Sequence, residues 1–317
     1  MPRNPKRQKK TKVSEFFSYV GLEPKKVKQV LQDKESYYKV WHKKEPNGKK
    51  RVIEAPRKTL KKMQRSILDR VEFRPGPWAH GGVRKKSIRT NALAHKGSKF
   101  LVRIDIKNAY PSLTKQMVKD HFLKMNAGVG LAKVLTELIT FRGHLPQGAP
   151  TSLAVFNHFL SLAGLDDAFS LIRVKKHSLK YSRYVDDLTF TSLFKIPPGL
   201  ENAVAKKLKE FGFTVNSAKT LRYSTKNRAL RITGVNLINN KPKVPPKKIK
   251  KFRGMIGRAT IDGSVSSAKI FGTVAYVMGI EKRIPHQLLV PLLKYLKARQ
   301  INCPPKIKKQ IDRQTKK

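Results

Sequence analysis

Three aspartates occupy positions where a carboxylate needs a cationic partner. Asp105 is embedded in an apolar run over residues 100–106 whose β-branched members are typical of a buried strand. Asp186 and Asp187 are adjacent at the centre of a strand-turn-strand pattern over residues 180–192. Adjacent carboxylates repel one another unless a cation lies beside them, and a buried unpaired carboxylate is costly. The pattern favours a divalent metal site of the polymerase kind, in which carboxylate oxygens hold magnesium ions that activate a 3′ hydroxyl and stabilise the leaving pyrophosphate.

The alternative is that these aspartates only form salt bridges with the abundant lysines and arginines. Asp166-Asp167 is the same dipeptide within a long helical pattern, and there a solvated salt bridge is the favoured interpretation. The turn context of Asp186-Asp187, with Tyr184 before it and a β-rich segment after it, favours the metal site instead.

The composition predicts a polyanionic partner. The chain has 317 residues, with 70 Lys+Arg against 20 Asp+Glu and a formal net charge of +50. Nucleic acid is favoured over anionic lipid, because the basic stretches contain few large apolar residues. A single cysteine, Cys303, excludes a disulfide scaffold and a cysteine-based zinc cluster and favours the cytoplasm. No apolar run reaches the ~20 residues that span a bilayer, so membrane insertion and export are not expected.

The elements that must position the aspartates follow from apolar periodicity and turn residues. Residues 1–12 are predicted to form a mobile basic arm, and residues 41–56 two strands around Asn47-Gly48. A lobe boundary is expected near residue 241, since residues 241–260 hold eight Lys+Arg, three prolines precede residue 247 and no acid occurs. The other predictions are helices over 13–40, 117–122, 131–141, 151–171 (capped by Thr151 and Ser152) and 200–211, strands over 100–106, 180–192, 213–215 and 229–237, three helices after 241, and a basic tail.

Four sequence blocks in a fixed order resemble the motifs of reverse transcriptases. They are residues 105–110 (DIKNAY), 145–152 (LPQGAPTS), 184–187 (YVDD) and 215–220 (VNSAKT), and the similarity covers about residues 50 to 240. The resemblance implies an α+β right-hand polymerase with fingers, a ferredoxin-like palm and a helical thumb. The expected division is 1–50 as basic arm and helices, 51–240 as fingers and palm, and 241–317 as a basic helical thumb that binds RNA.

Two further elements resemble those of bacterial retron reverse transcriptases. Residues 91–95 (NALAH) match an Asn-Ala-x-x-His element, and residues 232–234 (ITG) are close to a Val-Thr-Gly element. The resemblance implies that Asn91, His95, Thr233 and Gly234 belong to an RNA-binding surface. Without it, His95 would be interpreted as an ordinary surface or capping histidine. Val185 stands where retron enzymes often have Ala, and Ala109 where an aromatic residue is common.

The resemblance also implies a role for each residue of the site. Asp105, Asp186 and Asp187 would be the catalytic and metal-binding residues, with Asp187 in a supporting position. Tyr110 would be the steric gate against a ribose 2′ hydroxyl. Gln147 and Gly148 would lie against the templating base and nascent pair, and Lys219 would face the triphosphate or primer end. Arg70, Arg84 and Arg89 are alternative fingers contacts for triphosphate or template.

A retron-type enzyme would copy part of its own structured non-coding RNA into a short branched single-stranded DNA (msDNA). The resemblance implies priming from a guanosine 2′ hydroxyl, magnesium as cofactor, deoxynucleoside triphosphates as substrates, and antiphage defence with a separate effector protein. The short length fits an enzyme without a fused domain, and no ribonuclease H block is visible. The alternatives are another bacterial reverse transcriptase, of group II intron-like or abortive-infection type, and a non-catalytic RNA-binding scaffold.

Overall fold

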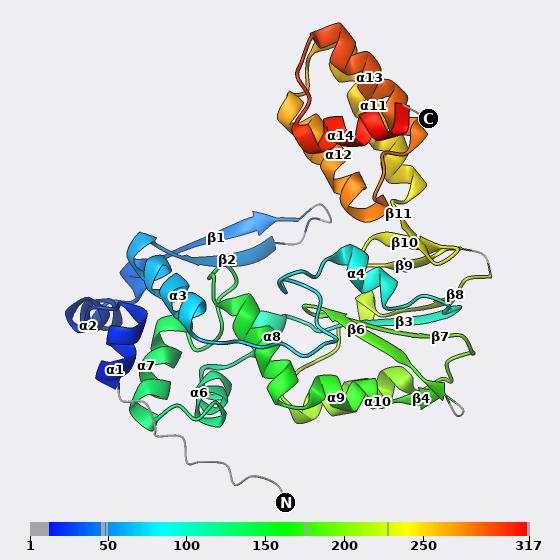
Figure 1. Ribbon diagram of the computed structural model, residues 1–317. Helices are drawn as coiled ribbons and strands as arrows, with labels where there is room; N and C mark the ends of the chain where they lie inside the picture. The colour runs from blue at the N-terminus through cyan, green and yellow to red at the C-terminus, as the bar shows by residue number, and fades with distance from the viewer. Residues whose placement is uncertain (1–12, 46–47, 49, 175–176, 227, 316–317) are drawn as a thin grey trace, which may run out of the picture.

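The computed structural model describes residues 13–45, 48, 50–174, 177–226 and 228–315. The predicted basic arm over residues 1–12 and the turn residue Asn47 lie outside the described residues. In Figure 1 the α+β molecule divides into fingers, palm and thumb, with the thumb helices on the other side of the palm sheet from α9 and α10. The predicted fold class is confirmed.

The palm is a four-stranded antiparallel sheet in the order β6-β7-β3-β8. Its strands are β3 (Phe100–Asp105), β6 (Lys180–Tyr184), β7 (Asp187–Ser192) and β8 (Leu221–Ser224). Helices connect β3 to β6 and β7 to β8, while β6 and β7 form a hairpin, which is the ferredoxin-like connection. Beside the sheet, β4 (Arg173–Val174) and β5 (His177–Ser178) form a separate pair.

The alternation of side chains along β3 separates two cores. Val102 and Ile104 are fully buried against the helices that cover one face of the sheet. Leu101 points the other way, into the core shared with the thumb. Because the side-chain period of a strand is two, Arg103 and Asp105 share the face of Leu101. The acidic end of β3 therefore lies on the face that the helix layer leaves uncovered.

The helix layer differs from the sequence prediction at one point. Residues 151–171 were predicted as one helix but form α8 (Ser152–Leu162) and α9 (Leu165–Ser170), because Gly164 between them has φ 73° and turns the chain. Thr151 makes no side-chain cap, and Ser152 Oγ instead donates to Pro146 O at 2.6 Å. The layer also contains α5 (Ala109–Ser112), α6 (Lys115–Lys124), α7 (Val129–Ile139) and α10 (Leu200–Glu210).

The fingers include the N-terminal helices. The predicted boundary at residue 50 falls within a hairpin, because β1 (Tyr38–Lys44) pairs with β2 (Lys50–Pro56) along its whole length. The N-terminal helix packs in the same core as the helix after this hairpin, so the described residues before 50 do not form a separate unit. The helical elements are α1 (Val13–Val20), α2 (Pro24–Gln32), η1 (Glu35–Tyr37) and α3 (Lys58–Arg70).

The thumb side begins before residue 241. The predicted strand over 229–237 is a hairpin of β9 (Leu230–Ile232) and β10 (Val235–Ile238), turning at Thr233 and Gly234, which both have positive φ. β11 (Lys241–Lys243) adds a third strand, so the predicted boundary lies inside this small sheet. The predicted strand over 213–215 is reduced to one bridge between Val215 and Ile106.

Four helices complete the thumb, and the predicted basic tail is one of them. They are α11 (Pro246–Asp262), α12 (Ser267–Glu281), α13 (His286–Arg299) and α14 (Pro305–Thr315). Ile307 and Ile311, four residues apart, place one face of α14 in the thumb core, which explains why the tail is ordered as a helix. Within the described residues, no helix is long and apolar enough to cross a membrane.

Candidate active site

The palm sheet brings Asp105 and Asp187 together from distant parts of the chain. Asp105 is the last residue of β3 and Asp187 the first of β7, and the two are direct partners in the antiparallel register. Ile106 N donates to Asp186 O at 2.9 Å, which ties the β6–β7 turn to the end of β3. The structure thus collects the three predicted catalytic aspartates at one edge of the sheet.

The turn that carries Asp186 is conformationally strained. Tyr184 pairs with Asp187, so Val185 and Asp186 form a two-residue loop. Val185 has φ 63°, a value that a β-branched side chain rarely adopts. Gly81 packs directly against it, since a Cβ at position 81 would lie 2.6 Å from Val185 Cγ2 and 2.9 Å from Val185 N. A glycine at position 81 is therefore required by the close approach of the turn.

The carboxylates resist full ionisation. Burial raises the pKa of Asp187 to about 7, and Asp186 and Asp105 contribute to the rise, whereas the charge of Arg103 lowers it. Burial and the charge of Asp105 also raise the pKa of Asp186. Burial and the neighbouring carboxylates disfavour ionisation of these aspartates. A bound cation would stabilise their charged forms.

Asp105 is held by the segment of the fourth motif block. Asn216 Nδ2 donates to Asp105 Oδ1 at 3.1 Å, and Asn216 N donates to Asp105 O at 2.8 Å. Lys219 Nζ lies 3.2 Å from the Asp105 carboxylate, with its side chain half exposed. Lys219 thus lies at the carboxylate edge, as a point charge that solvent and an anionic substrate can reach.

The residues at this edge fit a divalent cation. Asp187 Oδ1 is buried and accepts no hydrogen bond from any described residue, and Arg103 Nε lies 3.7 Å away. The described part of the chain contains no group of three or more acidic, histidine or cysteine residues arranged to hold a metal ion by themselves. Magnesium is commonly held by one or two carboxylates together with substrate phosphates, so an open pair of aspartates suits it better than an all-protein cage.

Tyr110 lies close enough to the site for the charge of Asp186 to affect its pKa. Its ring packs edge-to-face on Phe156 of α8, with centroids 5.6 Å apart. Burial, with a smaller contribution from the charge of Asp186, raises the pKa of Tyr110 to about 12. The ring is therefore fixed by α8 beside the turn that carries Asp186.

Gln147 and Gly148 pack against the fingers strand β2. Gln147 O accepts a hydrogen bond from Glu54 N at 2.9 Å. Gly148 has φ 142°, and a Cβ there would lie 2.9 Å from Glu54 O. Only glycine fits this conformation and this contact. The loop over residues 145–151 thereby joins the fingers hairpin to α8, which supports Tyr110.

Arg51 is a fingers residue that the sequence did not single out. It lies in β2, and its charge acts on both Tyr110 and Asp186. Its position in the sequence does not indicate a role at the site, because only the folded hairpin brings β2 to the palm. By contrast, Arg70 packs on Tyr19, with Cζ 5.5 Å from the ring centroid, and Arg89 Nε donates to Ile280 O of the thumb at 2.9 Å. Arg84 is exposed in the segment before α4 (Ile88–Leu93).

The prediction of an RNA-binding surface at Asn91 and His95 needs correction, because both side chains are fully buried. They lie in and just after α4 (Ile88–Leu93). His95 Nε2 and Nδ1 lie 2.7 Å from Ser182 Oγ and Thr191 Oγ1. Ser182 Oγ donates to Asn91 Oδ1 at 2.7 Å, and Asn91 Nδ2 donates to Thr233 Oγ1 at 2.6 Å. The two retron-like elements therefore join each other and the palm through the interior.

Replacing Asn91 with alanine is expected to destabilise the protein by about 2 kcal/mol, because Ser182 and Thr233 lose their buried partner. Thermal unfolding measures this, with exposed Asn202→Ala as the matched control. An unchanged melting temperature combined with weakened RNA binding would contradict the interior role and support direct RNA contact.

The burial of His95 predicts acid sensitivity. Burial, with a smaller contribution from the charges of His80 and Lys180, lowers its pKa to about 3. The unfolded chain binds the proton near pH 6.5, so stability present above this value falls as the pH drops toward 3, by about 1.4 kcal/mol per unit. Denaturant unfolding between pH 7 and 5 should show a shallower loss for His95→Gln than for exposed His42→Gln. Equal slopes would contradict this assignment.

The β9–β10 turn reaches a basic hollow beside the palm through Gly234. Gly234 lines a space of 480 Å³ with Arg103, Arg228 and Arg231. The guanidinium of Arg228 stacks 3.5 Å from the ring centroid of Tyr223. Arg103 connects this hollow to the carboxylates, since it lies near Asp187. A turn at Thr233-Gly234 thus faces a cavity suited to phosphate groups.

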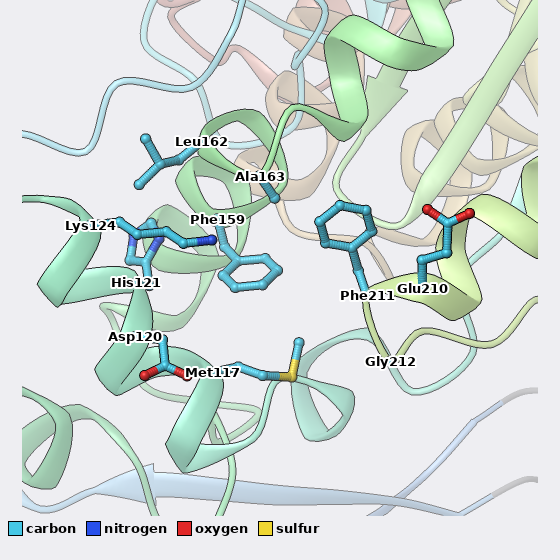
Figure 2. A pocket seen from close by; sticks show the side chains of 10 residues that line it. All are labelled: Met117, Asp120, His121, Lys124, Phe159, Leu162, Ala163, Glu210, Phe211 and Gly212. Atoms are coloured by element: carbon cyan, nitrogen blue, oxygen red, sulfur yellow. The ribbon is translucent and has the colours of Figure 1, made fainter.

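A second hollow has a different character. Phe159, Phe211 and Met117 are among the residues that line a space of 350 Å³. Figure 2 shows their side chains around it. It lies between α6, α8 and the residues after α10, within the helix layer. None of the predicted site residues lines it. The apolar hollow therefore does not belong to the carboxylate edge.

The solvated salt bridge predicted for Asp166 is also corrected. Asp166 does form an ion pair, with Arg183 Nη2 2.9 Å from Asp166 Oδ2. The pair is not solvated, however, because the side chain of Asp166 is only 1% exposed and that of Arg183 0%. Asp167, its neighbour, is exposed. Helical periodicity could not distinguish the two, because the partner comes from a strand that lies beside α9 only in the folded protein.

Comparison with known proteins assigns the family. Residues 41–237 match the family described as reverse transcriptase (RNA-dependent DNA polymerase). The match begins within strand β1 of the fingers hairpin and covers the whole palm with the carboxylate edge. The chain belongs to the reverse transcriptase family. Its four motif blocks lie within the matched residues, as the sequence resemblance predicts.

Retron enzymes are among the curated relatives of this reverse transcriptase, which confirms the expected resemblance. Retron Mx162 reverse transcriptase of Myxococcus xanthus is 33% identical over 234 residues, covering 64% of this chain and 47% of the relative. Retron Mx65 reverse transcriptase, from the same organism, is 30% identical over 263 residues, covering 73% and 58%. The chain spans about half the length of these two relatives.

A third relative is covered more completely. Retron Ec86 reverse transcriptase of Escherichia coli is 27% identical over 262 residues, covering 80% of this chain and 78% of the relative. A solved telomerase from Candida albicans aligns over 87% of this chain and 63% of its own, at 12% identity and a TM-score of 0.43, a likeness too low to bear on function.

Proposed function

We propose that this protein is a retron-type RNA-directed DNA polymerase. The observation that carries the proposal is the pairing of Asp105 with Asp187 in the palm register, with Asp186 in the adjoining turn, in a chain of the reverse transcriptase family. The curated relatives named as retron reverse transcriptases support the retron type. The proposed reaction copies part of a structured non-coding RNA into msDNA, starting from a guanosine 2′ hydroxyl.

Asp105 and Asp186 are the proposed metal ligands, with Asp187 supporting them, and Mg²⁺ is the proposed ion. When bound, divalent ions lower the pKa of the attacking hydroxyl and stabilise the leaving pyrophosphate. Tyr110 would restrict the space at the sugar, and Gln147 and Gly148 would lie along the nascent pair. Lys219 and Arg51 supply positive charge for the triphosphate beside the carboxylates.

The proposed RNA contacts lie on the thumb and the β9–β10 turn. The segment over residues 241–260 carries eight Lys+Arg and no acid. A-form RNA is bound through phosphates and 2′ hydroxyls, which lysine and arginine side chains on helices can reach. Thr233 and Gly234 are proposed to contact RNA at the basic hollow, whereas Asn91 and His95 would act by holding that turn.

Partners and setting complete the proposal. Deoxynucleoside triphosphates are the proposed substrates, the cytoplasm the compartment, and a separate effector protein in antiphage defence the partner of the RNA–protein complex. At a net charge of +50, binding to any RNA should be steeply salt-dependent, so selection of one RNA must come from its shape.

The test is to purify the protein from its native host with its bound nucleic acid. Denaturing gels before and after ribonuclease and debranching treatment should show a short DNA whose mobility changes with both treatments. DNA that is insensitive to debranching would indicate another type of bacterial reverse transcriptase. RNA alone, with no DNA after added deoxynucleotides and magnesium, would indicate a non-catalytic RNA-binding scaffold.

A further inference from the structure

Arg183 lies directly beneath the turn that carries Asp186. It belongs to β6, and its side chain points to the helix-covered face of the palm. The side chain of Asp187 lies on the other face of the sheet. The side chain is fully buried, in a chain where most basic residues have solvent to point into. A buried guanidinium is costly unless its charge and its donors are all matched. Its partners therefore indicate what it holds in place.

Two residues from the helix layer orient the guanidinium. Arg183 Nε and Nη2 donate to the two carboxylate oxygens of Asp166, at 3.0 and 2.9 Å. Asn157 of α8 accepts from Nη1 at its Oδ1, at 2.5 Å, and from Nη2 at its carbonyl oxygen, at 3.2 Å. This paired geometry fixes both the position and the rotation of the planar group.

The remaining contact reaches the turn itself. Arg183 Nη1 donates to Val185 O at 3.2 Å, the carbonyl that immediately precedes Asp186. Val185 has the unfavourable φ of 63°. A strained turn persists only when its surroundings hold it, and a charged donor aimed at its central carbonyl is such a restraint.

A second restraint acts on the same strand from the fingers side. Arg183 N donates to Trp78 O at 2.8 Å, and Arg183 O accepts from His80 N at 2.7 Å. Asn157 Nδ2 donates to Gly81 O at 2.8 Å, and Gly81 packs on Val185. Asn157 thus connects the buried guanidinium to Gly81, whose loop packs against the turn.

We propose that Arg183, oriented by Asp166 and Asn157, is a positioning residue that holds the strained turn so that Asp186 lies beside Asp105. The inference rests on the proposed polymerase function, because its effect is on the rate of nucleotide addition. It predicts that the fork geometry of the guanidinium matters as well as its charge. Lysine at position 183 would keep the charge but could not bridge Asp166, Asn157 and Val185 together.

Asp166→Asn and Arg183→Lys are the test variants, and Asp167→Asn is the matched control, since it makes the same change at the exposed neighbour. Displacement of a reacting group costs about 100-fold in rate. We expect such a loss in kcat for primer extension by both test variants, with KM for deoxynucleotides and RNA affinity unchanged. Asp167→Asn should match the wild type. A kcat equal to that of the wild type in folded Asp166→Asn would overturn the inference.

A rescue variant separates positioning from a general folding defect. Adding Val185→Gly to Asp166→Asn should recover at least part of the lost kcat, because glycine adopts the positive φ without restraint. No recovery, together with a kcat that falls only in proportion to the folded fraction, would overturn the inference.

A milder variant decides the case if Asp166→Asn does not fold. Tyr181→Phe removes one hydrogen bond to Asp166, of 2.8 Å, and leaves the ion pair, so a several-fold loss of kcat is expected. An unchanged kcat would overturn the inference. Absence of DNA synthesis by the wild type itself would instead overturn the proposed function, and this inference with it.

Discussion

Replacing Asp105 or Asp186 with asparagine is expected to reduce DNA synthesis by at least about 1,000-fold. Asparagine has the shape of aspartate but lacks the negative charge that holds a divalent ion. Asp105 pairs with Asp187 in the sheet register, and the charge of Asp105 raises the pKa of Asp186. Removing either carboxylate therefore leaves the proposed metal site with too little charge. Primer extension with a defined RNA template and magnesium measures the loss.

The same substitution should leave the fold intact. Burial and the charge of Asp105 raise the pKa of Asp186, which means that folding disfavours its charged form near neutral pH. Asp186→Asn should therefore melt at the same temperature as the wild type or higher. RNA affinity should also persist, as it should for the double variant Asp186→Ala with Asp187→Ala. Asp167→Asn, at an exposed site, is the control. Unchanged synthesis would refute the assignment of the site.

Replacing Tyr110 with valine is expected to reduce the preference for deoxynucleotides over ribonucleotides by about 100-fold. The ring is fixed against Phe156, with centroids 5.6 Å apart, and lies beside the turn of Asp186. A ring in this place would fill the space that a 2′ hydroxyl needs, and valine would leave that space open. The ratio of kcat/KM for matched deoxynucleotide and ribonucleotide triphosphates measures the effect.

Tyr110→Phe is the matched control for this prediction. The described residues provide no hydrogen-bond partner for the Tyr110 hydroxyl, so phenylalanine keeps the packing and the bulk. Its discrimination should equal that of the wild type. If Tyr110→Val discriminated as well as the wild type, the steric role would be excluded. If Tyr110→Phe lost discrimination, the hydroxyl and not the ring would be the selective group.

The buried polar contacts of α4 have a broader implication for the thumb. Asn91 joins the palm residue Ser182 to Thr233 in the β9–β10 turn, and Arg89 joins α4 to Ile280 of the thumb. The retron-like elements thus connect palm and thumb across the interior. Substitutions there are expected to alter RNA binding indirectly, by displacing the surface that is proposed to contact the RNA.

Local patterns predicted most of the palm. Apolar alternation and β-branched residues located β3, β6 and β7, and turn chemistry located the β1–β2 hairpin. The prediction failed at Gly164 and at Thr233-Gly234, where positive φ divides a continuous apolar pattern into two elements. A glycine within such a pattern can be tolerated or can break it, and packing decides which. The same applies to α14, whose two isoleucines needed a partner surface to become ordered.

The sequence by itself determined the charge, the order of the motif blocks and the identity of the three aspartates. These properties are local, because each depends on residue type and on spacing along one segment. Only the tertiary structure decided that Asn91 and His95 are interior, that Asp166 pairs with Arg183 beneath the turn, and that the charge of Arg51 acts on Asp186. Burial and hydrogen bonding between segments far apart in the chain, such as Asn91 and Thr233 with a separation of 142 residues, depend on how strands and helices assemble, which no short segment specifies.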